Sequence, residues 1–290
     1  MDKPARPRPP LSRRGFLKLS AAGAVGWGLR PAWTGPPAWP RLASTLRLPF
    51  PHTYLADPDA LLAHPPAGFD LLLAPAYVAA GLIQRGLVQP LAGPPGRAHD
   101  PDGAYTVPYR LAVSAIVYPA GAGADDPWQA PLAWPAHGRL VLGAALQRRG
   151  FSPNDTHAGH LAQAGADLAA LRPALSADPL ASLYGGGVWA AFVPAPFSPE
   201  GALELDEGLA ATPPPWGGML IEYDWVLPTN APDVEAALGF LAGLPPLLVA
   251  PSALGAGWQA APLAPLPGRA QAQHRRLWAD LTRERHDAGG

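Results

Sequence analysis

Residues 69–91 read FDLLLAPAYVAAGLIQRGLVQPL, and this stretch decides the fold class. The continuous apolar run 69–74 is typical of a strand that is buried in a parallel sheet. The following residues, 77–86, predict a helix that ends at Gly86, because glycine readily adopts the backbone conformation found at helix C-termini. A buried strand followed directly by a helix is the repeating unit of an α/β fold.

The rest of the chain continues this alternation of strands and helices. Asp57 and Pro58 predict a helix start, since Asp is a good N-cap and Pro suits the first helical position. Strands are predicted at 45–49, at 105–118 (as one or two strands), at 139–142, at the end of 180–192 and at 220–227, and helices at 57–62, 143–150, 154–170, at the start of 180–192, and at 231–244 and 269–285. We therefore expect an α/β protein with largely parallel sheets.

The composition is that of a globular chain with an uneven charge distribution. Its 290 residues include 32 glycines and 40 prolines, but 48% are hydrophobic and the net charge is −1, so the composition is not that of a disordered chain. Residues 1–30 carry seven Lys/Arg against one Asp, whereas residues 42–268 carry eight Arg against 18 Asp/Glu. An acidic body argues against nucleic acid as a partner, because phosphate binding needs a basic face.

The N-terminus is typical of an export signal. Residues 12–18, SRRGFLK, resemble the twin-arginine (Tat) signal, with Arg13 and Arg14 followed by Phe16 and Leu17, and a short apolar stretch follows at 19–29. A disordered basic tail before a short helix is the alternative interpretation. We expect cleavage between residues 34 and 43, a Pro-rich linker over 31–41, and the Tat translocase as a partner during export. The chain has no cysteine, which excludes a lipoprotein anchor, disulfides and thiolate zinc sites.

Four segments of the exported part form an ordered pattern. They are FDLLLAPAY at 69–77 with GLI at 81–83 and GLVQPL at 86–91, YTVPYRLA at 105–112, RRGFSPNDT at 148–156, and GGML at 217–220 with WVLP at 225–228 and the residues 230–241. In order and spacing over about residues 65–245 they resemble the spermidine/putrescine-type solute-binding proteins of bacterial ABC importers. The chain is similar to a shortened, divergent member of that family.

The resemblance implies a two-lobed periplasmic-binding-protein fold of the α/β class, with a ligand cleft between lobes that are joined by crossover strands. The implied parts are 1–43 (signal and linker), 44–111 with 226–268 (lobe 1), 112–225 (lobe 2) and 269–290 (an Arg-rich C-terminal helix). The acidic segment with which this family holds ligand amines has no counterpart near Leu142, and the Asp of its return strand falls on Tyr223. The chain is therefore either a member with a changed ligand or one that has lost transport binding.

Capture of a diamine needs carboxylates for its ammonium groups and aromatic faces along its methylenes. The resemblance implies eight candidate ligand-binding residues, for several of which ordinary packing is the alternative: Tyr77, Tyr109, Arg110, Trp189, Glu222, Tyr223, Asp224 and Trp225. Because side chains alternate along a strand, the 222/224 pair and the 223/225 pair lie on opposite faces, and we expect the face of Tyr223 to line the cleft.

Two charged features have alternative interpretations. Arg110 either pairs with Asp224 or Glu222 or meets an anionic group of a ligand. His157 and His160 are one helical turn apart and close to Asp155, but an HxxH pair is more typical of a solvated helix face than of a metal site.

The sequence has none of the motifs of a nucleophile elbow, a P-loop, an HExxH zinc site or a dinucleotide fold, so we expect no enzyme activity, cofactor or metal. We predict an exported, periplasmic or extracytoplasmic solute-binding protein of an ABC importer, monomeric, which captures a small polar, polyamine-like solute and delivers it to a membrane permease. A degenerate binding fold that serves as a non-transport sensor or interaction protein of the envelope is the alternative, and a small exported hydrolase is a third interpretation, ranked last.

Overall fold

The computed structural model describes residues 40–46, 48, 51–63, 67–91, 93–94, 96–122, 132–197, 202–244 and 259–288. The predicted export-signal residues Arg13, Arg14, Phe16 and Leu17 lie outside these ranges, as does most of the predicted linker. The elements are β1 (Leu42–Ser44), β2 (Thr53–Tyr54), α2 (Ala60–Ala63), β3 (Leu71–Pro75), α3 (Ala76–Gln84), β4 (Val88–Gln89), β5 (Thr106–Pro119), β6 (Leu132–Pro135), α4 (Gly138–Arg148), α5 (Ala158–Leu171), β7 (Ala174–Ser176), α6 (Pro179–Tyr184), β8 (Ala190–Pro196), β9 (Leu209–Thr212), β10 (Gly218–Pro228), α7 (Val234–Gly243), β11 (Ala260–Pro262) and α8 (Gly268–Ala288).

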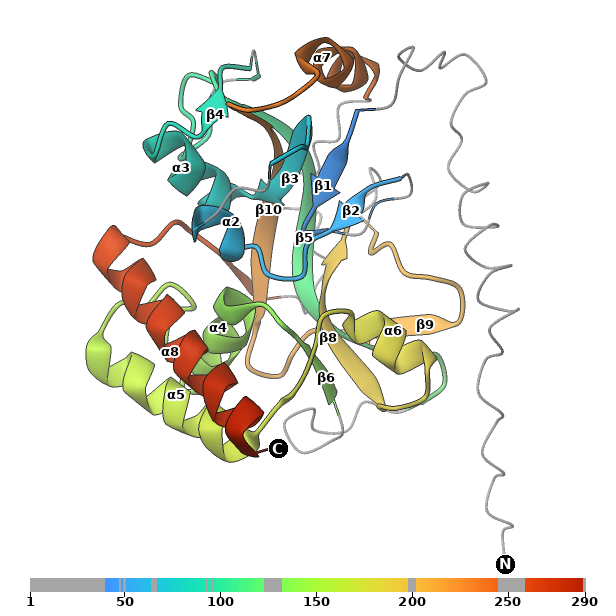
Figure 1. Cartoon of the computed structure of the whole chain (residues 1–290). Helices are drawn as coiled ribbons and strands as arrows, with labels where there is room; N and C mark the ends of the chain where they lie inside the picture. Colours follow the sequence, from blue (N-terminus) through green and yellow to red (C-terminus); the bar gives the residue numbers. More distant parts are fainter. Residues whose placement is uncertain are drawn as a thin grey trace, which may run out of the picture.

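The strands of the described residues form one mixed sheet whose main order is β2-β1-β3-β10-β5-β8-β6-β7, while β4 and β11 pair with β10 and β9 pairs with β5 (Figure 1). At one end β2, β1 and β3 run parallel, and at the other end β8, β6 and β7 run parallel. The long central strands β10 and β5 pair antiparallel with each other and with their outer neighbours. The sheet thus has a first half around β3 and a second half around β6, and two strands are common to both.

The directions of these strands bring the two parallel sets together at the centre. Three successive antiparallel pairings separate β3 from β8, so the two sets run in opposite directions. The carboxyl end of β3 reaches the middle of β10, where Pro75 pairs with Tyr223, and the carboxyl end of β8 reaches the middle of β5, where Pro196 pairs with Ala112. The loops that follow the two parallel sets therefore meet at the same central region.

A β-bulge marks this central region. Tyr223 pairs with Arg110, but the next residue of β10, Asp224, pairs with Pro108, so Tyr109 is the extra residue on β5. A bulge bends the strand and increases its twist. The bend lies where β5 and β10 leave the first half and enter the second.

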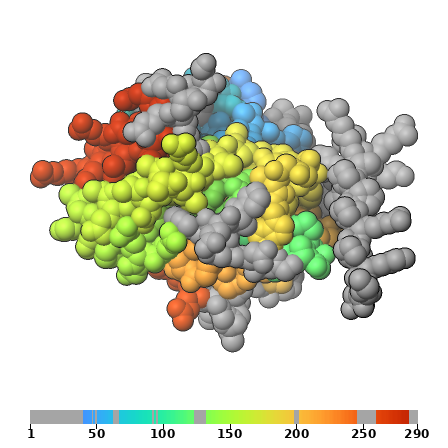
Figure 2. Space-filling model, turned by 90° about the horizontal axis from the view of Figure 1, so that it is seen from below, coloured from blue at the N-terminus to red at the C-terminus, as the bar shows by residue number. Residues whose placement is uncertain are grey.

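Three of the larger helices cover the second half. Helices α4, α5 and α8 pack on one another, to the left of the sheet in Figure 1, whereas α6 packs on β6 and β8 to its right. Figure 2 shows α5 and the red C-terminal helix α8 next to each other on the lower face. On α8, Ala270 and His274 are buried and Trp278 lies against Gly138 of α4. None of the described helices is long and apolar enough to span a membrane.

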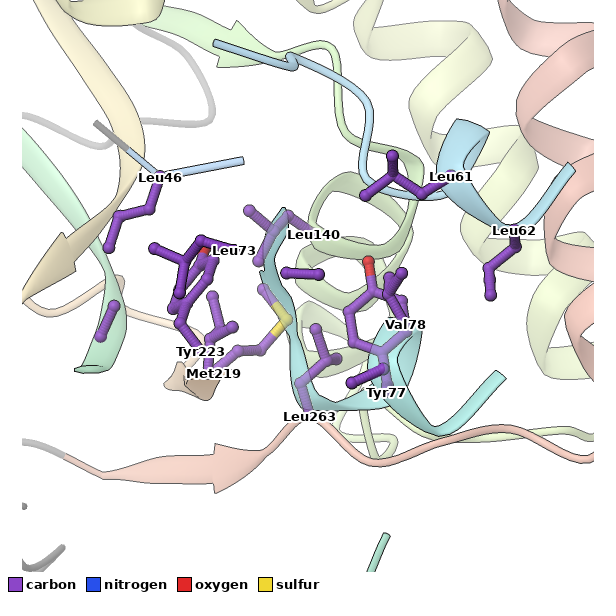
Figure 3. Close-up of a cluster of buried hydrophobic side chains, with 14 of the residues drawn as sticks. Leu46, Leu61, Leu62, Leu73, Tyr77, Val78, Leu140, Met219, Tyr223 and Leu263 are labelled. Carbon is purple, nitrogen blue, oxygen red and sulfur yellow. The ribbon is translucent and has the colours of Figure 1, made fainter. Parts of the chain in front are cut away.

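A single large hydrophobic cluster runs through both halves (Figure 3). It joins Leu73 and Val78 of the first half to Leu140 and Met219 of the second, with Tyr223 of the central strand among them. The halves are thus packed against each other by the apolar side chains that line the central region.

The structure confirms most predicted elements and corrects two, and it replaces the expected largely parallel arrangement with a mixed sheet whose central strands are antiparallel to their neighbours. The predicted strand 139–142 is wrong, because these residues belong to α4. The strand in this part of the chain is β6, which begins seven residues earlier. A short apolar run has the same appearance in a buried strand and a buried helix, and Arg139 to Leu146 are all buried. The first strand is β1, which ends before the predicted range 45–49 begins.

Candidate functional site

A cluster of buried polar side chains lies where the two halves meet. We call Asp59, Tyr77, His137, Arg139 and His274 the central polar cluster. Tyr77 is in the first turn of α3, directly after β3, and His137 is the residue before α4, in the loop that follows β6. In α/β sheets this region beyond the carboxyl ends of the strands is where ligands bind.

Tyr77 and His137 connect the two halves. The Tyr77 hydroxyl is 2.7 Å from Nε2 of His137, and the two rings are stacked with their centroids 6.3 Å apart. Burial, and then the positive charge of Arg139, lowers the pKa of His137 to about 3, so the imidazole is neutral at physiological pH. Burial also raises the pKa of Tyr77 well above its usual value, which keeps its hydroxyl protonated.

Arg139 lies against the same tyrosine and is held by hydrogen bonds to two other segments of the chain, around Asn154 and Ala264. Its guanidinium carbon is 5.5 Å from the centre of the Tyr77 ring, within the range of a cation–π interaction. Nη2 donates to Oδ1 of Asn154 at 3.0 Å and to the carbonyl of Ala264 at 3.1 Å. Arg139 is only 2% exposed, and these acceptors supply the hydrogen bonds that a buried cation requires.

His274 of α8 completes the support of Arg139. Its Nδ1 is 3.4 Å from Nη1 of Arg139, and its Nε2 is 3.2 Å from the carbonyl oxygen of Asp155. Burial and the neighbouring guanidinium lower the pKa of His274 to about 4. A neutral ring that donates from Nε2 and accepts at Nδ1 satisfies both contacts.

Asp59 brings a carboxyl group into the cluster from the turn before α2. Burial, and then the charge of Asp57, raise its pKa from 3.8 to about 7, against the opposing effects of Arg139 and the Tyr77 hydroxyl. Asp57 accepts a hydrogen bond from the backbone N–H of Asp59 at 3.0 Å, which fixes the turn. The cluster therefore contains one carboxyl group that exchanges a proton near neutral pH, next to a permanent cation.

The structure distributes the eight sequence-predicted residues over five places. Tyr77 and Tyr223 both lie in the central region, on the side of the sheet that we expected to line a cleft (Figure 3). Tyr109 and Trp225 are buried in contact with each other, with ring centroids 5.5 Å apart. Trp189 lies elsewhere, stacked on Tyr118 near the far end of β5.

Arg110 has a partner that the sequence did not predict. It forms an ion pair with Glu204, whereas Glu222 and Asp224 both form ion pairs with Arg97. The expected pairing of Arg110 with Asp224 or Glu222 is therefore wrong. The physical reason is that the 202–205 segment brings Glu204 alongside β8, with Glu204 N–H bonded to the carbonyl of Pro196.

Glu222 and Asp224 share one face of β10, as strand alternation predicted. Arg97 contacts both, and Nε2 of His99 lies 2.8 Å from Oδ2 of Asp224. Burial, followed by the charge of Asp224, raises the pKa of Glu222. This group is on the opposite face of β10 from Tyr223 and is separate from the central polar cluster.

Sequence reasoning missed Asp59, His137, Arg139 and His274. Arg139 was assigned to a strand, and the others come from three segments that only the tertiary structure joins. The one available signal was the pair Pro135 and Gly138, since a Pro that ends a strand and a Gly that begins a helix bracket a βα loop.

Comparison with known proteins gives the fold. No family model matches the chain, and no curated protein sequence matches it. A protein from Listeria monocytogenes described as a spermidine/putrescine ABC transporter superposes with a TM-score of 0.62 at 17% identity, covering 80% of this chain and 90% of its own. The fold is that of the two-lobed periplasmic binding proteins.

Two other solved structures agree with this result. The spermidine/putrescine ABC transporter substrate-binding protein of Streptococcus pneumoniae gives a TM-score of 0.54 at 13% identity and covers 84% of this chain and 99% of its own. A periplasmic thiamin-binding protein gives 0.55 at 14% identity, with coverage of 88% and 98%. The central polar cluster lies where the first and second halves of the sheet meet.

Proposed function

We propose that this protein is the exported solute-binding component of an ABC importer and that it captures a small polar solute at the central polar cluster. The observation that carries the proposal is the convergence of two parallel strand sets on one buried polar cluster, bridged by Tyr77 and His137. The fold supports it, because proteins of this fold close two lobes around a ligand by hinge motion.

Closure explains why a binding site is buried in this structure. Tyr77, His137, Arg139 and His274 are each at most 3% exposed, so a solute reaches them only when the lobes separate. The bulge at Tyr109 and the register change between Tyr223 and Asp224 lie on the two strands that connect the lobes. We propose this bulge as the hinge, with the lobe boundaries at 44–111 plus 226–268 and at 112–225.

A polyamine-like solute is the finer part of the proposal. Asp57 and Asp59 provide carboxyl groups for an ammonium group, and the Tyr77 ring provides a face for cation–π contact. In the structure the guanidinium of Arg139 takes the place beside Tyr77 that an ammonium group would take. We propose that the solute displaces this internal cation from the ring when it binds.

The export route and the partners are part of the same proposal. The SRRGFLK sequence at 12–18 supports export by the Tat translocase to the periplasm or another extracytoplasmic space. The loaded protein then docks as a monomer on a membrane permease. The protein binds and releases its solute without chemical change, since the proposal assigns no residue a catalytic role.

Ligand-dependent thermal unfolding tests the proposal. The full chain without its signal is heated with increasing putrescine, spermidine, thiamine, amino acids or organic anions. We expect the unfolding midpoint to rise with putrescine or spermidine concentration, because a ligand that binds only the folded state stabilises it.

Two variants locate the binding. Asp59→Asn is expected to abolish the rise, whereas Asp167→Asn, which breaks an ion pair of Asp167 with Arg149 on the surface, is expected to leave it unchanged. Absence of a response to every compound contradicts solute capture. An equal response in Asp59→Asn contradicts the assignment to the central polar cluster.

A further inference from the structure

The face of β10 opposite the central polar cluster carries a second group of polar residues. Glu222 and Asp224 project from it, and the 97–104 loop places His99 beside them. Asp100 makes this loop rigid, because its carboxylate accepts hydrogen bonds from three backbone N–H groups and from the Thr106 hydroxyl. His99 is thus held in place by the fold.

An imidazole nitrogen of His99 and a carboxylate oxygen of Asp224 lie close together without forming a hydrogen bond. His99 Nε2 and Asp224 Oδ2 are 2.8 Å apart, and their side chains are only 4% and 0% exposed. Among the described residues neither atom has a hydrogen-bond partner, so they are not oriented as donor and acceptor toward each other. Leaving buried polar atoms in this state is costly, and a cation held between their lone pairs removes the cost.

The other contacts of these carboxylates leave the two atoms available. Asp224 uses Oδ1 for Arg97, whose Nη1 lies 2.7 Å away, so Oδ2 is the oxygen that faces His99. Arg97 also contacts Glu222, and the two carboxylates outweigh its single positive charge. The group has a net charge of −1 when His99 is neutral and both carboxylates are ionised, which attracts a second cation.

We infer that His99, Glu222 and Asp224 form a binding site for a divalent transition-metal ion of the Zn²⁺ type. Their ligand atoms all lie within 4.8 Å of one another. One imidazole nitrogen with two carboxylate oxygens is a donor set that zinc accepts, and it leaves a fourth position for water. The side chain of Glu222 is 39% exposed, which provides the path by which the ion enters from solvent.

His157 and His160, the HxxH pair, are the alternative candidate for zinc binding among the histidines of this chain. His160 Nδ1 is already 2.8 Å from Oδ2 of Asp155, and the His160 ring stacks on Phe151 with centroids 3.8 Å apart. The metal-ligand cluster found among the described residues is the one at His99, not the pair at His157 and His160. Substitution of His99 can therefore be compared with substitution of His160 in its effect on Zn²⁺ binding.

Calorimetric titration of the chelator-treated, untagged full chain with Zn²⁺ tests the inference. We expect one saturable site per chain. His99→Ala is expected to weaken binding by about 10-fold or more, since even loss of a supporting residue has an effect of that size. His160→Ala is the matched control and is expected to bind like the unaltered protein.

Glu222→Gln keeps the test decisive if His99→Ala does not fold, because Glu222 is partly exposed and its substitution leaves the core intact. Circular dichroism and the urea midpoint establish that each variant is folded. No saturable binding by the unaltered chain overturns the inference. Undiminished binding by folded Glu222→Gln and His99→Ala, or loss of binding in His160→Ala, overturns it as well.

Discussion

The Tyr77 hydroxyl lies 2.7 Å from Nε2 of His137, and this contact joins the first turn of α3 in the first half of the sheet to the start of α4 in the second half. Both side chains are buried, so neither has water as an alternative partner. This hydrogen bond therefore contributes to the stability of the contact between the two halves of the sheet.

Removal of this hydroxyl is expected to destabilise the protein. Tyr77→Phe keeps the ring but leaves a buried imidazole nitrogen without its partner, which costs about 1–3 kcal/mol. Urea unfolding followed by tryptophan fluorescence measures the change. Tyr118→Phe is the control, because Tyr118 stacks on Trp189 outside the central polar cluster; an equal loss in both variants contradicts the prediction.

Asp59→Asn is expected to stabilise the protein increasingly as the pH rises. The pKa of Asp59 is raised from 3.8 in an unfolded chain to about 7 by burial, so between these values the folded state holds a proton that the unfolded state loses. This carboxyl group therefore costs stability as the pH rises from about 4 to 7. Asparagine carries no such penalty. Urea midpoints at pH 4.5 and pH 8 are expected to differ more from the unaltered protein at the higher pH.

His137 and His274 have the opposite dependence on pH. Their pKa values are lowered to about 3 and about 4. On acidification below about pH 6.5 the unfolded state therefore binds protons that the folded state does not bind. Stability is then expected to fall between pH 6.5 and pH 4, by at most about 1.4 kcal/mol per pH unit for each group. In an Asp59→Asn background, which removes the opposing carboxyl group, the fall should be steeper. A flat profile in that background speaks against buried neutral histidines.

Arg139→Met is expected to be among the most destabilising single changes in the protein. It leaves the carbonyl of Ala264 without this donor, at about 1–3 kcal/mol, and it removes one of two hydrogen bonds to the amide oxygen of Asn154, which still accepts from the backbone N–H of Ala264. Arg149→Met removes an exposed ion pair with Asp167 instead and should change the urea midpoint little. Similar losses in the two variants would mean that Arg139 is not held as described.

The start of α4 has no space for a side chain at Gly138. A Cβ atom there would lie 2.7 Å from Cγ of Trp278 on α8. Gly138→Ala is therefore expected to separate α4 from α8 and to destabilise the protein by about 1–3 kcal/mol, as overpacking does. Gly268→Ala is the control, since no atom lies within 4 Å of the added methyl group. Thermal unfolding compares the two.

Local sequence patterns predicted the elements whose signals are themselves local. The apolar run before Tyr77 gives β3 and α3, and the patterns around Trp225 give β10. The prediction missed the start of α4, because the N-cap residue His137 makes no side-chain hydrogen bond to the helix and the sequence has no helix-start signal there. Arg139 was consequently placed on a strand.

The candidate site depends on contacts between distant segments, and these were only partly predictable. The resemblance covers helix α3 and strand β10, and for this reason Tyr77 and Tyr223 were among the predicted residues; their role in binding stays a prediction. Asp59, His137 and His274 lie on separate parts of the chain, and no spacing rule relates them. The position of Glu204 beside Arg110 is likewise a product of tertiary packing.

The hydrophobic cluster that joins the two halves of the sheet has a consequence for the affinity of the proposed solute. Separation of the lobes exposes apolar side chains such as Leu140, Met219 and Tyr223 to water, at about 25 cal/mol for each Å². The open arrangement is then a minor population of the solute-free protein. Under the proposed function, a solute that enters only the open arrangement binds with an apparent affinity reduced by that population, and the packing of the core then sets the solute concentration at which the protein is half-saturated.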